Sequence, residues 1–322
     1  MISENIALKI KRLLDDAQNV CIVLHANPDA DTLGCSLAMA QYLQDQKKPY
    51  DLFCQTPLPS LLQTLPHAHK ITSNEELVIK TEPDLVIAFD ASDLRFSGLE
   101  NLLAKLEPKP FLINIDHHKT NTLYGDLNIV YPEAAAATQI VFELLKLWGA
   151  NITKEMAECL LFGLLMDTQA FANPATNAGA LRVANELISL GANLKYLREK
   201  FLKTKPAALL QILGQALQNI LKNPQLDTAI MIIKEENFKV AGIAFDEASG
   251  ISNYLNYLND SSLAIVLKES LDGRIHCSMR STKTKVDLGQ LALALGGGGH
   301  AKAAGFTIHG KIDRMGDSWK II

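Results

Sequence analysis

The chain has 322 residues, of which 48% are hydrophobic, and it carries a formal net charge of −4 with a pI near 6.1. This length and apolar content are sufficient for two domains that each bury a core. The slightly acidic balance argues against a protein that coats long nucleic acid, because duplex-binding proteins usually carry a basic face.

The sequence also indicates where the protein works. Its first residues lack the basic start and apolar block of a signal peptide. The longest apolar stretch, around Cys159 to Met166, is far shorter than the roughly 20 residues of a membrane span. The five cysteines show no paired spacing. We therefore expect a cytoplasmic protein with reduced thiols and no membrane partner.

Apolar runs predict strands in the first part of the chain, at about 20–25, 50–54, 84–90 and 111–116. They alternate with apolar-periodic helices, notably at 33–46. Continuous apolar runs are typical of a parallel sheet that is buried on both faces. The expected fold class is therefore α/β, with a doubly wound parallel sheet.

After Tyr131-Pro132 the pattern predicts successive helices, at 133–148, 153–166, 176–190, 194–203 and 206–222. A break at Asn223-Pro224 ends the last helix, and strands are expected again at 228–233, 262–268 and 274–280. We expect a first domain over residues 1–190, a helical connector over 191–223 and a smaller α/β domain over 224–322.

Histidines and aspartates gather where the predicted strands end. The segment His25-Ala26-Asn27-Pro28-Asp29-Ala30-Asp31 follows the first strand, and Pro28 indicates a loop because it cannot continue a ladder. Asp90 ends the third strand, and Asp116-His117-His118 closes the fourth. Parallel sheets bind ligands beyond the carboxyl ends of their strands, so these side chains are expected at one edge. A fourth carboxylate, Asp167, follows the apolar stretch that ends at Met166.

Mixed carboxylates and imidazoles suit manganese better than magnesium or calcium, and the absence of cysteine from the clusters argues against structural zinc. Asp29 and Asp31 straddle one residue of a loop that we expect to be extended, so their carboxylates would diverge towards two ions, which Asp90 and Asp167 would bridge. Two such ions hold a hydroxide for attack at phosphorus. The alternative is structural, because a single Asp after a strand is most often a cap or turn residue.

A glycine run, Gly296 to Gly299, precedes His300 near the carboxyl end. Successive glycines let backbone N–H groups approach an anion, and a helix beginning near His300 would add its positive end. Arg280 offers a planar fork for phosphate, and Lys283 and Lys285 add positive charge. The pattern favours a phosphate cradle; the alternative is a flexible glycine linker.

The motifs HANPDAD, FDASD, DHH, MDT and GGGGH occur in this order. In this order they resemble those of the DHH-family phosphoesterases with a C-terminal DHH-associated domain, and within that family the nanoRNase/pAp-phosphatase branch, which is related to RecJ-type exonucleases. The resemblance covers nearly the whole chain. It implies that residues 1–190 form the metal-binding catalytic domain and that residues 224–322 bind nucleotide and phosphate.

The resemblance also implies roles for single residues. One metal would be held by His25, Asp29, Asp90 and Asp167, and the other by Asp31, Asp90, His117 and Asp167. Asp116 would orient His117, while His118 would face the scissile phosphate or the leaving group. The nucleotide would be contacted by Arg280, Ser281, Gly298, Gly299 and His300, and His300 would also reach the reacting phosphate.

The activity implied by the resemblance is manganese-dependent hydrolysis of short oligoribonucleotides to mononucleotides, with removal of the 3′-phosphate from pAp. A phosphodiesterase acting on cyclic di-AMP or on its linear product pApA is the alternative. A third hypothesis is that the protein is a nucleotide-binding module without catalytic activity. The expected partners are therefore short RNA or small nucleotides, and a homodimer would be unsurprising.

Overall fold

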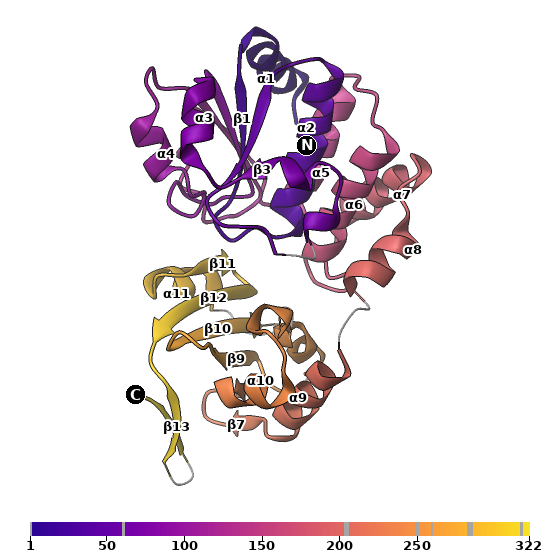
Figure 1. The fold of residues 1–322 in the computed structure, drawn as a ribbon. Coiled ribbons are helices and arrows are strands. Elements are labelled where there is room, and N and C mark those ends of the chain that lie inside the picture. The colour runs from indigo at the N-terminus through magenta and orange to yellow at the C-terminus, as the bar shows by residue number, and fades with distance from the viewer. Residues whose placement is uncertain are drawn as a thin grey trace. The chain divides into compact units, whose positions relative to one another are not determined.

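The computed structural model describes residues 2–59, 62–202, 206–248, 251–258, 260–281, 286–315 and 318–322. The chain divides into two compact units, Met1–Leu202 and Lys203–Ile322, and each has its own sheet (Figure 1). Lys283 and Lys285, which the sequence suggests as phosphate-binding side chains, lie outside the described residues. Within the described residues, no helix combines the length and apolar character needed to cross a membrane.

The first unit contains a six-stranded sheet in the order β3-β2-β1-β4-β5-β6, and every pairing in it is parallel. Its strands are β1 (Val20–Leu24), β2 (Tyr50–Cys54), β3 (Ile71–Thr72), β4 (Leu85–Phe89), β5 (Phe111–Asp116) and β6 (Leu127–Val130). The doubly wound α/β fold is confirmed, and the four predicted strands are β1, β2, β4 and β5. The strand order reverses between β1 and β4, where such folds bind their ligands.

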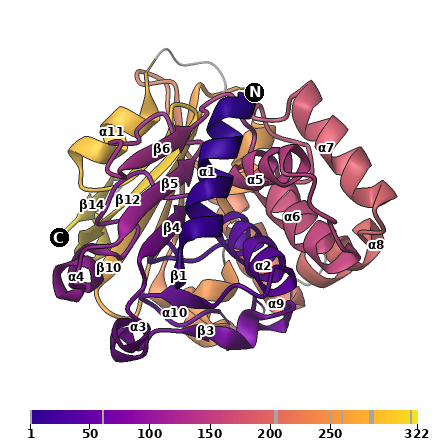
Figure 2. The same cartoon turned by 90° about the horizontal axis from the view of Figure 1, so that it is seen from above.

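Helices cover both faces of this sheet (Figure 2). In β1, Val20, Ile22 and Leu24 point to one core and Cys21 and Val23 to the other, as the two-residue period of a strand requires. The first core includes residues of α1 (Glu4–Asp16), α2 (Ala30–Asp45), α5 (Ala137–Leu147), α6 (Lys154–Asp167), α7 (Ala178–Ser189) and α8 (Leu194–Leu197). The second includes residues of α3 (Glu75–Thr81) and α4 (Glu100–Lys105).

Two helix starts differ from the prediction. Helix α2 begins at Ala30, because the carboxylate of Asp29 caps it by accepting hydrogen bonds from the backbone N–H groups of Asp31 and Thr32. Asp31 therefore lies in the first helical turn and not in an extended loop. The helix expected at 133–148 begins only at Ala137, after an extended residue at Ala136.

Helices α2 and α6 pack very closely. A Cβ atom added at Gly34 would lie 2.5 Å from the carbonyl oxygen of Cys159, and one added at Gly163 would lie 2.9 Å from Oδ1 of Asp31. Both distances are shorter than real Cβ contacts, so the contact between these helices requires glycine at both positions. The contact brings the start of α2 next to α6, which ends at Asp167.

The second unit contains a six-stranded mixed sheet in the order β11-β12-β10-β9-β8-β7. Its strands are β7 (Leu221–Asn223), β8 (Thr228–Ile233), β9 (Leu263–Glu269), β10 (Arg274–Ser281), β11 (Gly298–His300) and β12 (Ala303–His309). Its helices are α9 (Ala207–Gln218), α10 (Glu235–Ala241) and α11 (Leu288–Ala294), and a hairpin of β13 (Ile312–Met315) and β14 (Ser318–Ile321) follows. The three strands predicted here are confirmed as β8, β9 and β10.

Two local predictions in this unit were wrong. The helix expected over 206–222 ends at Gln218, because residues from Leu221 onward form β7 and pair with β8. A helix was also expected to begin near His300, but Gly298–His300 form β11, which pairs antiparallel with β12. Gly298 and Gly299 of the glycine run are therefore strand residues, and neither a helix start nor a flexible linker describes them.

Candidate active site

Strands β1, β4 and β5 end side by side. Leu24 pairs with Phe89, and Phe89 pairs with Ile115, so the three strands reach their carboxyl ends at the same level. The next residues along the three strands are His25, Asp90 and Asp116. The register of the parallel sheet therefore brings together side chains that are far apart in the sequence.

The six predicted metal ligands lie close together. The Nε2 atom of His117 is 3.3 Å from Oδ1 of Asp90, 3.6 Å from Oδ2 of Asp167 and 3.8 Å from Oδ2 of Asp31. The Nε2 atom of His25 is 3.5 Å from Oδ1 of Asp29 and 3.7 Å from Oδ2 of Asp90. Ligand atoms at about 2.1 Å from one ion lie roughly 3 Å from each other, so these groups are close to a coordinating arrangement.

Several buried atoms of the cluster fit a cation. Oδ1 of Asp90 is buried and has no hydrogen-bond partner among the described residues, and the nitrogen of His25 that faces the cluster is Nε2. Buried polar atoms are normally satisfied, and a carboxylate oxygen without a donor is a suitable metal ligand. Nδ1 of His117 lies 3.3 Å from the carbonyl oxygen of Ala134, and a hydrogen bond there directs the lone pair of Nε2 at the carboxylates.

The carboxylates also repel one another. Burial, together with the charges of Asp90 and Asp167, raises the pKa of Asp31 well above its usual range. Burial raises the pKa of Asp167 to about 6, with Asp90 adding to the shift and His117 opposing it. A divalent cation among these groups would remove the repulsion. The donor set and its electrostatics therefore both fit a metal site.

Asp31 and Asp29 have structural roles in addition to their place in the cluster. The carboxylate of Asp31 accepts hydrogen bonds from the backbone N–H groups of Ala137 and Thr138, at 2.6 and 2.9 Å, and from the Thr138 hydroxyl at 2.7 Å. It thus binds the amino-terminal end of α5, where a negative charge is favourable. Asp29 caps α2. The structural and the metal-binding interpretations of these two residues are therefore compatible.

Asp116 holds the ring of His118. Oδ1 of Asp116 accepts a hydrogen bond from the backbone N–H of His117 and lies 2.7 Å from Nδ1 of His118. Its Oδ2 accepts a hydrogen bond of 2.5 Å from the side-chain amide of Asn121. Both oxygens of Asp116 are therefore occupied. Asp116 contacts His117 through the backbone, while Ala134 contacts the ring of that histidine.

Three residues that support the site are not predicted from the sequence. Thr138 binds Asp31, Asn121 binds Asp116, and the hydroxyl of Thr32 accepts from the backbone N–H of His25 and donates to the carbonyl of Phe89. A threonine near a predicted helix start is a known cap signal, but the prediction began that helix four residues too early. Asn121 carries no such signal, because asparagine is common in any turn.

The predicted phosphate-binding residues of the second unit gather at one end of its sheet. Ala303 of β12 pairs with Arg280 of β10 on one side and with His300 of β11 on the other, so Arg280 and His300 lie at the same level. The guanidinium of Arg280 donates to the carbonyl of Met279 and to the hydroxyl of Ser252. Ser281 is buried, and its hydroxyl donates to the carbonyl oxygen of Ser262.

The glycines of this segment are not equivalent. A Cβ atom at Gly297 would lie 2.1 Å from the carbonyl oxygen of Gly305, and one at Gly299 would lie 2.6 Å from that of Ala303. A Cβ atom at Gly298 would meet nothing within 4 Å. Gly297 and Gly299 therefore permit the close approach of β11 to β12, whereas Gly296 and Gly298 have open space beside them.

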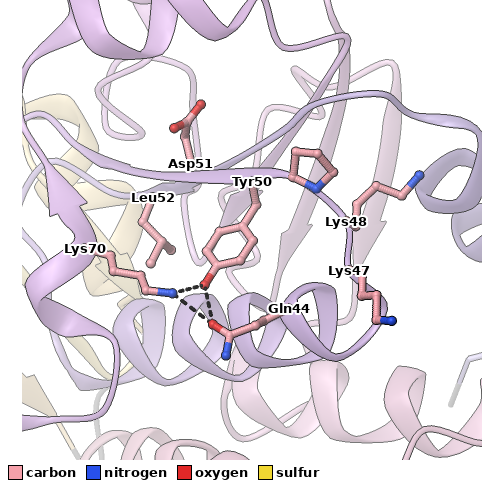
Figure 3. A pocket seen from close by; sticks show the side chains of 8 residues that line it. Gln44, Lys47, Lys48, Tyr50, Asp51, Leu52 and Lys70 are labelled. Carbon is pink, nitrogen blue, oxygen red and sulfur yellow. Dashed lines mark hydrogen bonds between the residues drawn. The ribbon is translucent and has the colours of Figure 1, made fainter.

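A separate surface pocket of about 400 Å³ lies at the amino-terminal end of β2, away from the strand ends that carry the cluster (Figure 3). Two of its three lysines have internal partners: Lys70 donates to Gln44 and Tyr50, and Lys48 donates to the carbonyl groups of Asp15 and Ala17. No residue that lines the pocket belongs to the histidine and aspartate cluster.

Comparisons with known proteins agree with this geometry. Residues 19–164 match the DHH family N-terminal domain, and residues 238–317 match the DHHA1 domain. The bifunctional oligoribonuclease and PAP phosphatase NrnA of Thermus thermophilus is 30% identical over 292 residues, which cover 90% of this chain and 84% of that protein. The cyclic-di-AMP phosphodiesterase GdpP of Bacillus subtilis is 23% identical over 316 residues, which cover 94% of this chain but 46% of that protein.

A solved structure shows the same fold. An exopolyphosphatase-related protein from Bacteroides fragilis superposes with a TM-score of 0.87 at 24% identity, over 97% of this chain and 93% of that one. Both domains expected of the family are thus present in order, and the NrnA relative is similar along most of both chains. The chain therefore belongs to the DHH family, as a phosphoesterase of the NrnA type.

Proposed function

We propose that this protein hydrolyses short oligoribonucleotides to mononucleotides and removes the 3′-phosphate from pAp, using divalent metal ions. The observation that carries the proposal is the buried cluster in which Asp90 lies between His25 and His117. The similarity to the Thermus thermophilus NrnA supports the substrate class, because that protein is named for both activities and is similar over most of its length.

The described ligands would form two sites that share Asp90. His25, Asp29 and Asp90 would hold one ion, and Asp31, His117 and Asp167 would hold the other, with Asp90 also close to His117. We assign manganese to both sites, since the donors are mixed carboxylates and imidazoles. Divalent ions in such sites supply electrophilic assistance to displacement at phosphorus.

The chain's own residues would supply the remaining chemistry. Asp116 fixes the orientation of the His118 ring through Nδ1, so Nε2 is the ring nitrogen that His118 offers to a substrate. We assign His118 to donate a proton from Nε2 to the leaving oxygen, and Asp116 to stabilise the protonated ring. Binding of the substrate phosphates is assigned to Arg280, Ser281, Gly298, Gly299 and His300.

A second candidate is hydrolysis of cyclic di-AMP or pApA. It is favoured by the similarity to the GdpP of Bacillus subtilis, which is named a cyclic-di-AMP phosphodiesterase. That similarity is lower in identity and covers less than half of the relative. It therefore supports the second candidate less than the NrnA relative supports the first.

A turnover assay in manganese tests the proposal. It compares kcat/KM for a 5′-phosphorylated RNA dinucleotide, a long RNA, pAp and cyclic di-AMP. Fast cleavage of the dinucleotide and of pAp, with slow turnover of the other two, is the expected result. A preference for cyclic di-AMP would favour the second candidate, and binding of these nucleotides without any turnover would indicate a binding module.

A further inference from the structure

Three consecutive residues after α6 have a left-handed backbone although none of them is glycine. The φ angles are 52° at Gln169, 55° at Ala170 and 66° at Phe171. Residues with a Cβ atom visit this region mostly as single asparagine or aspartate residues. A run of three requires the surrounding structure to enforce it, and backbone strain of this kind concentrates at functional sites. This turn directly follows Asp167 and Thr168.

Hydrogen bonds from Thr168 and Asn173 enforce the turn. Thr168 is fully buried; its hydroxyl donates to the carbonyl of Leu164 at 2.6 Å and accepts from the backbone N–H of Phe171 at 3.2 Å. The carbonyl of Thr168 accepts from the N–H groups of Ala172 and Asn173. The side-chain amide of Asn173 donates to the carbonyl oxygen of Asp167 at 2.7 Å. These bonds connect residues 171–173 to Thr168 and to the last residues of α6.

Asp167 needs such a restraint more than Asp90 does. Asp90 directly follows a buried central strand, whereas Asp167 is the last residue of a helix. A negative charge is unfavourable at a helix carboxyl end, and the charges of Asp90 and Asp29 repel the carboxylate while His117 attracts it. Its side chain is 30% exposed, so solvent is within its reach. Without a restraint, the carboxylate would turn towards water and away from His117.

We propose that Thr168 and Asn173 are positioning residues, which use the left-handed turn Gln169–Phe171 to hold the carboxylate of Asp167 beside His117, ready to bind a divalent cation. This inference rests on the proposed metal-dependent function. It predicts that disruption of the turn weakens cation binding even when the protein remains folded. A turn with a purely structural role would change stability alone.

Two matched pairs of variants separate these roles. Gln169→Gly and Gln169→Val both remove the side-chain amide, but glycine accepts a φ of 52° and the β-branched valine does not. Thr168→Val and Thr168→Ser both change the side chain, but only serine keeps a hydroxyl that bonds Leu164 and Phe171. Asn173→Ala removes the bond to the Asp167 carbonyl from a position that is only partly buried.

The test is calorimetric titration of the metal-free full-length variants with MnCl2, after circular dichroism has established that each is folded. The Gln169→Val, Thr168→Val and Asn173→Ala variants are expected to bind Mn²⁺ about 10- to 100-fold more weakly, as is typical when a group that orients a ligand is removed. The Gln169→Gly and Thr168→Ser variants are expected to bind Mn²⁺ like the natural protein.

The outcomes distinguish the inference from the function on which it rests. If the natural protein does not bind Mn²⁺, the proposed function fails. If it binds Mn²⁺ and the folded Gln169→Val variant binds equally tightly, the function stands and the positioning role is overturned. If Thr168→Val does not fold, the Gln169 pair and Asn173→Ala decide the question, because these positions are not fully buried.

Discussion

The close contact of α2 and α6 makes Gly163→Ala an informative substitution. The added methyl group would lie 2.6 Å from Cγ2 of Thr138, 2.9 Å from Oδ1 of Asp31 and 3.0 Å from the carbonyl oxygen of Ala30. Oδ1 of Asp31 is the atom that accepts from both the backbone and the hydroxyl of Thr138. The methyl group would therefore clash with Asp31 and with the start of α5, to which Asp31 is hydrogen-bonded.

The magnitude of the effect follows from two opposing terms. Overpacking of a tight core costs about 1–3 kcal/mol, and replacement of glycine by alanine within a helix returns about 1 kcal/mol. A net loss of up to about 2 kcal/mol is expected. In a unit of this size, it lowers the melting temperature by roughly 2–4 °C per kcal/mol. Displacement of Asp31 should also weaken manganese binding.

Differential scanning calorimetry and manganese titration measure both effects. Gly214→Ala is the matched control, because Gly214 also lies within a helix and a Cβ atom there would meet nothing within 4 Å. The control should be stabilised by up to about 1 kcal/mol, with unchanged metal affinity. If Gly163→Ala is as stable as the control and binds manganese fully, the packing argument is refuted.

Four further predictions concern the site and the second unit. Asp90→Asn keeps the side-chain volume, and asparagine tolerates the left-handed backbone at φ 56°, so the substitution removes only the negative charge. It should abolish turnover and weaken manganese binding, and retained activity would exclude Asp90 as a ligand. Arg280→Ala should raise KM for short RNA more than it lowers kcat, and an unchanged KM would place the phosphate site elsewhere. Asn121→Leu leaves Oδ2 of Asp116 without its hydrogen-bond donor, so it should cost about 1–3 kcal/mol of stability and lower kcat. An unchanged kcat would show that Asn121 does not support the site. Burial and two neighbouring cations lower the pKa of His276 in the folded protein, so the unfolded chain binds the proton first as the pH falls below about 6.5. Between pH 7.5 and 5, the natural protein should therefore lose stability relative to His276→Gln. Free energies of unfolding that change with pH in the same way for both proteins would contradict this.

The central sheet and the ligand cluster could be predicted from the sequence for one physical reason. Strands buried on both faces must be continuously apolar, so a polar residue that ends such a run marks the edge of the sheet. Asp90 and Asp116 are visible in this way. The short edge strands β3 and β6 carry no comparable run, because each is only partly buried. They depend on the neighbouring strand for their structure.

The remaining features depend on contacts between distant parts of the chain. Thr138 binds an acid 107 residues earlier in the sequence, and local patterns contain no information about such a pairing. The helix expected to begin near His300 is wrong for a related reason. Gly298 and Gly299 lie in a strand, and a Cβ atom at Gly297 or Gly299 would collide with β12, a contact that no local pattern reveals.

The bonds that Asp31 makes to α5 have a consequence for how this site evolves. A single carboxylate both offers an oxygen to the cluster and ties together the starts of two helices. Selection for a stable fold therefore preserves Asp31 even in a descendant that no longer performs the reaction. The carboxylate of Asp90 contacts His25, His117 and His118 of the cluster itself and makes no such bond to a helix start among the described residues, so it has no such protection. Among relatives, the residue after β4 should thus be the more reliable marker of retained activity.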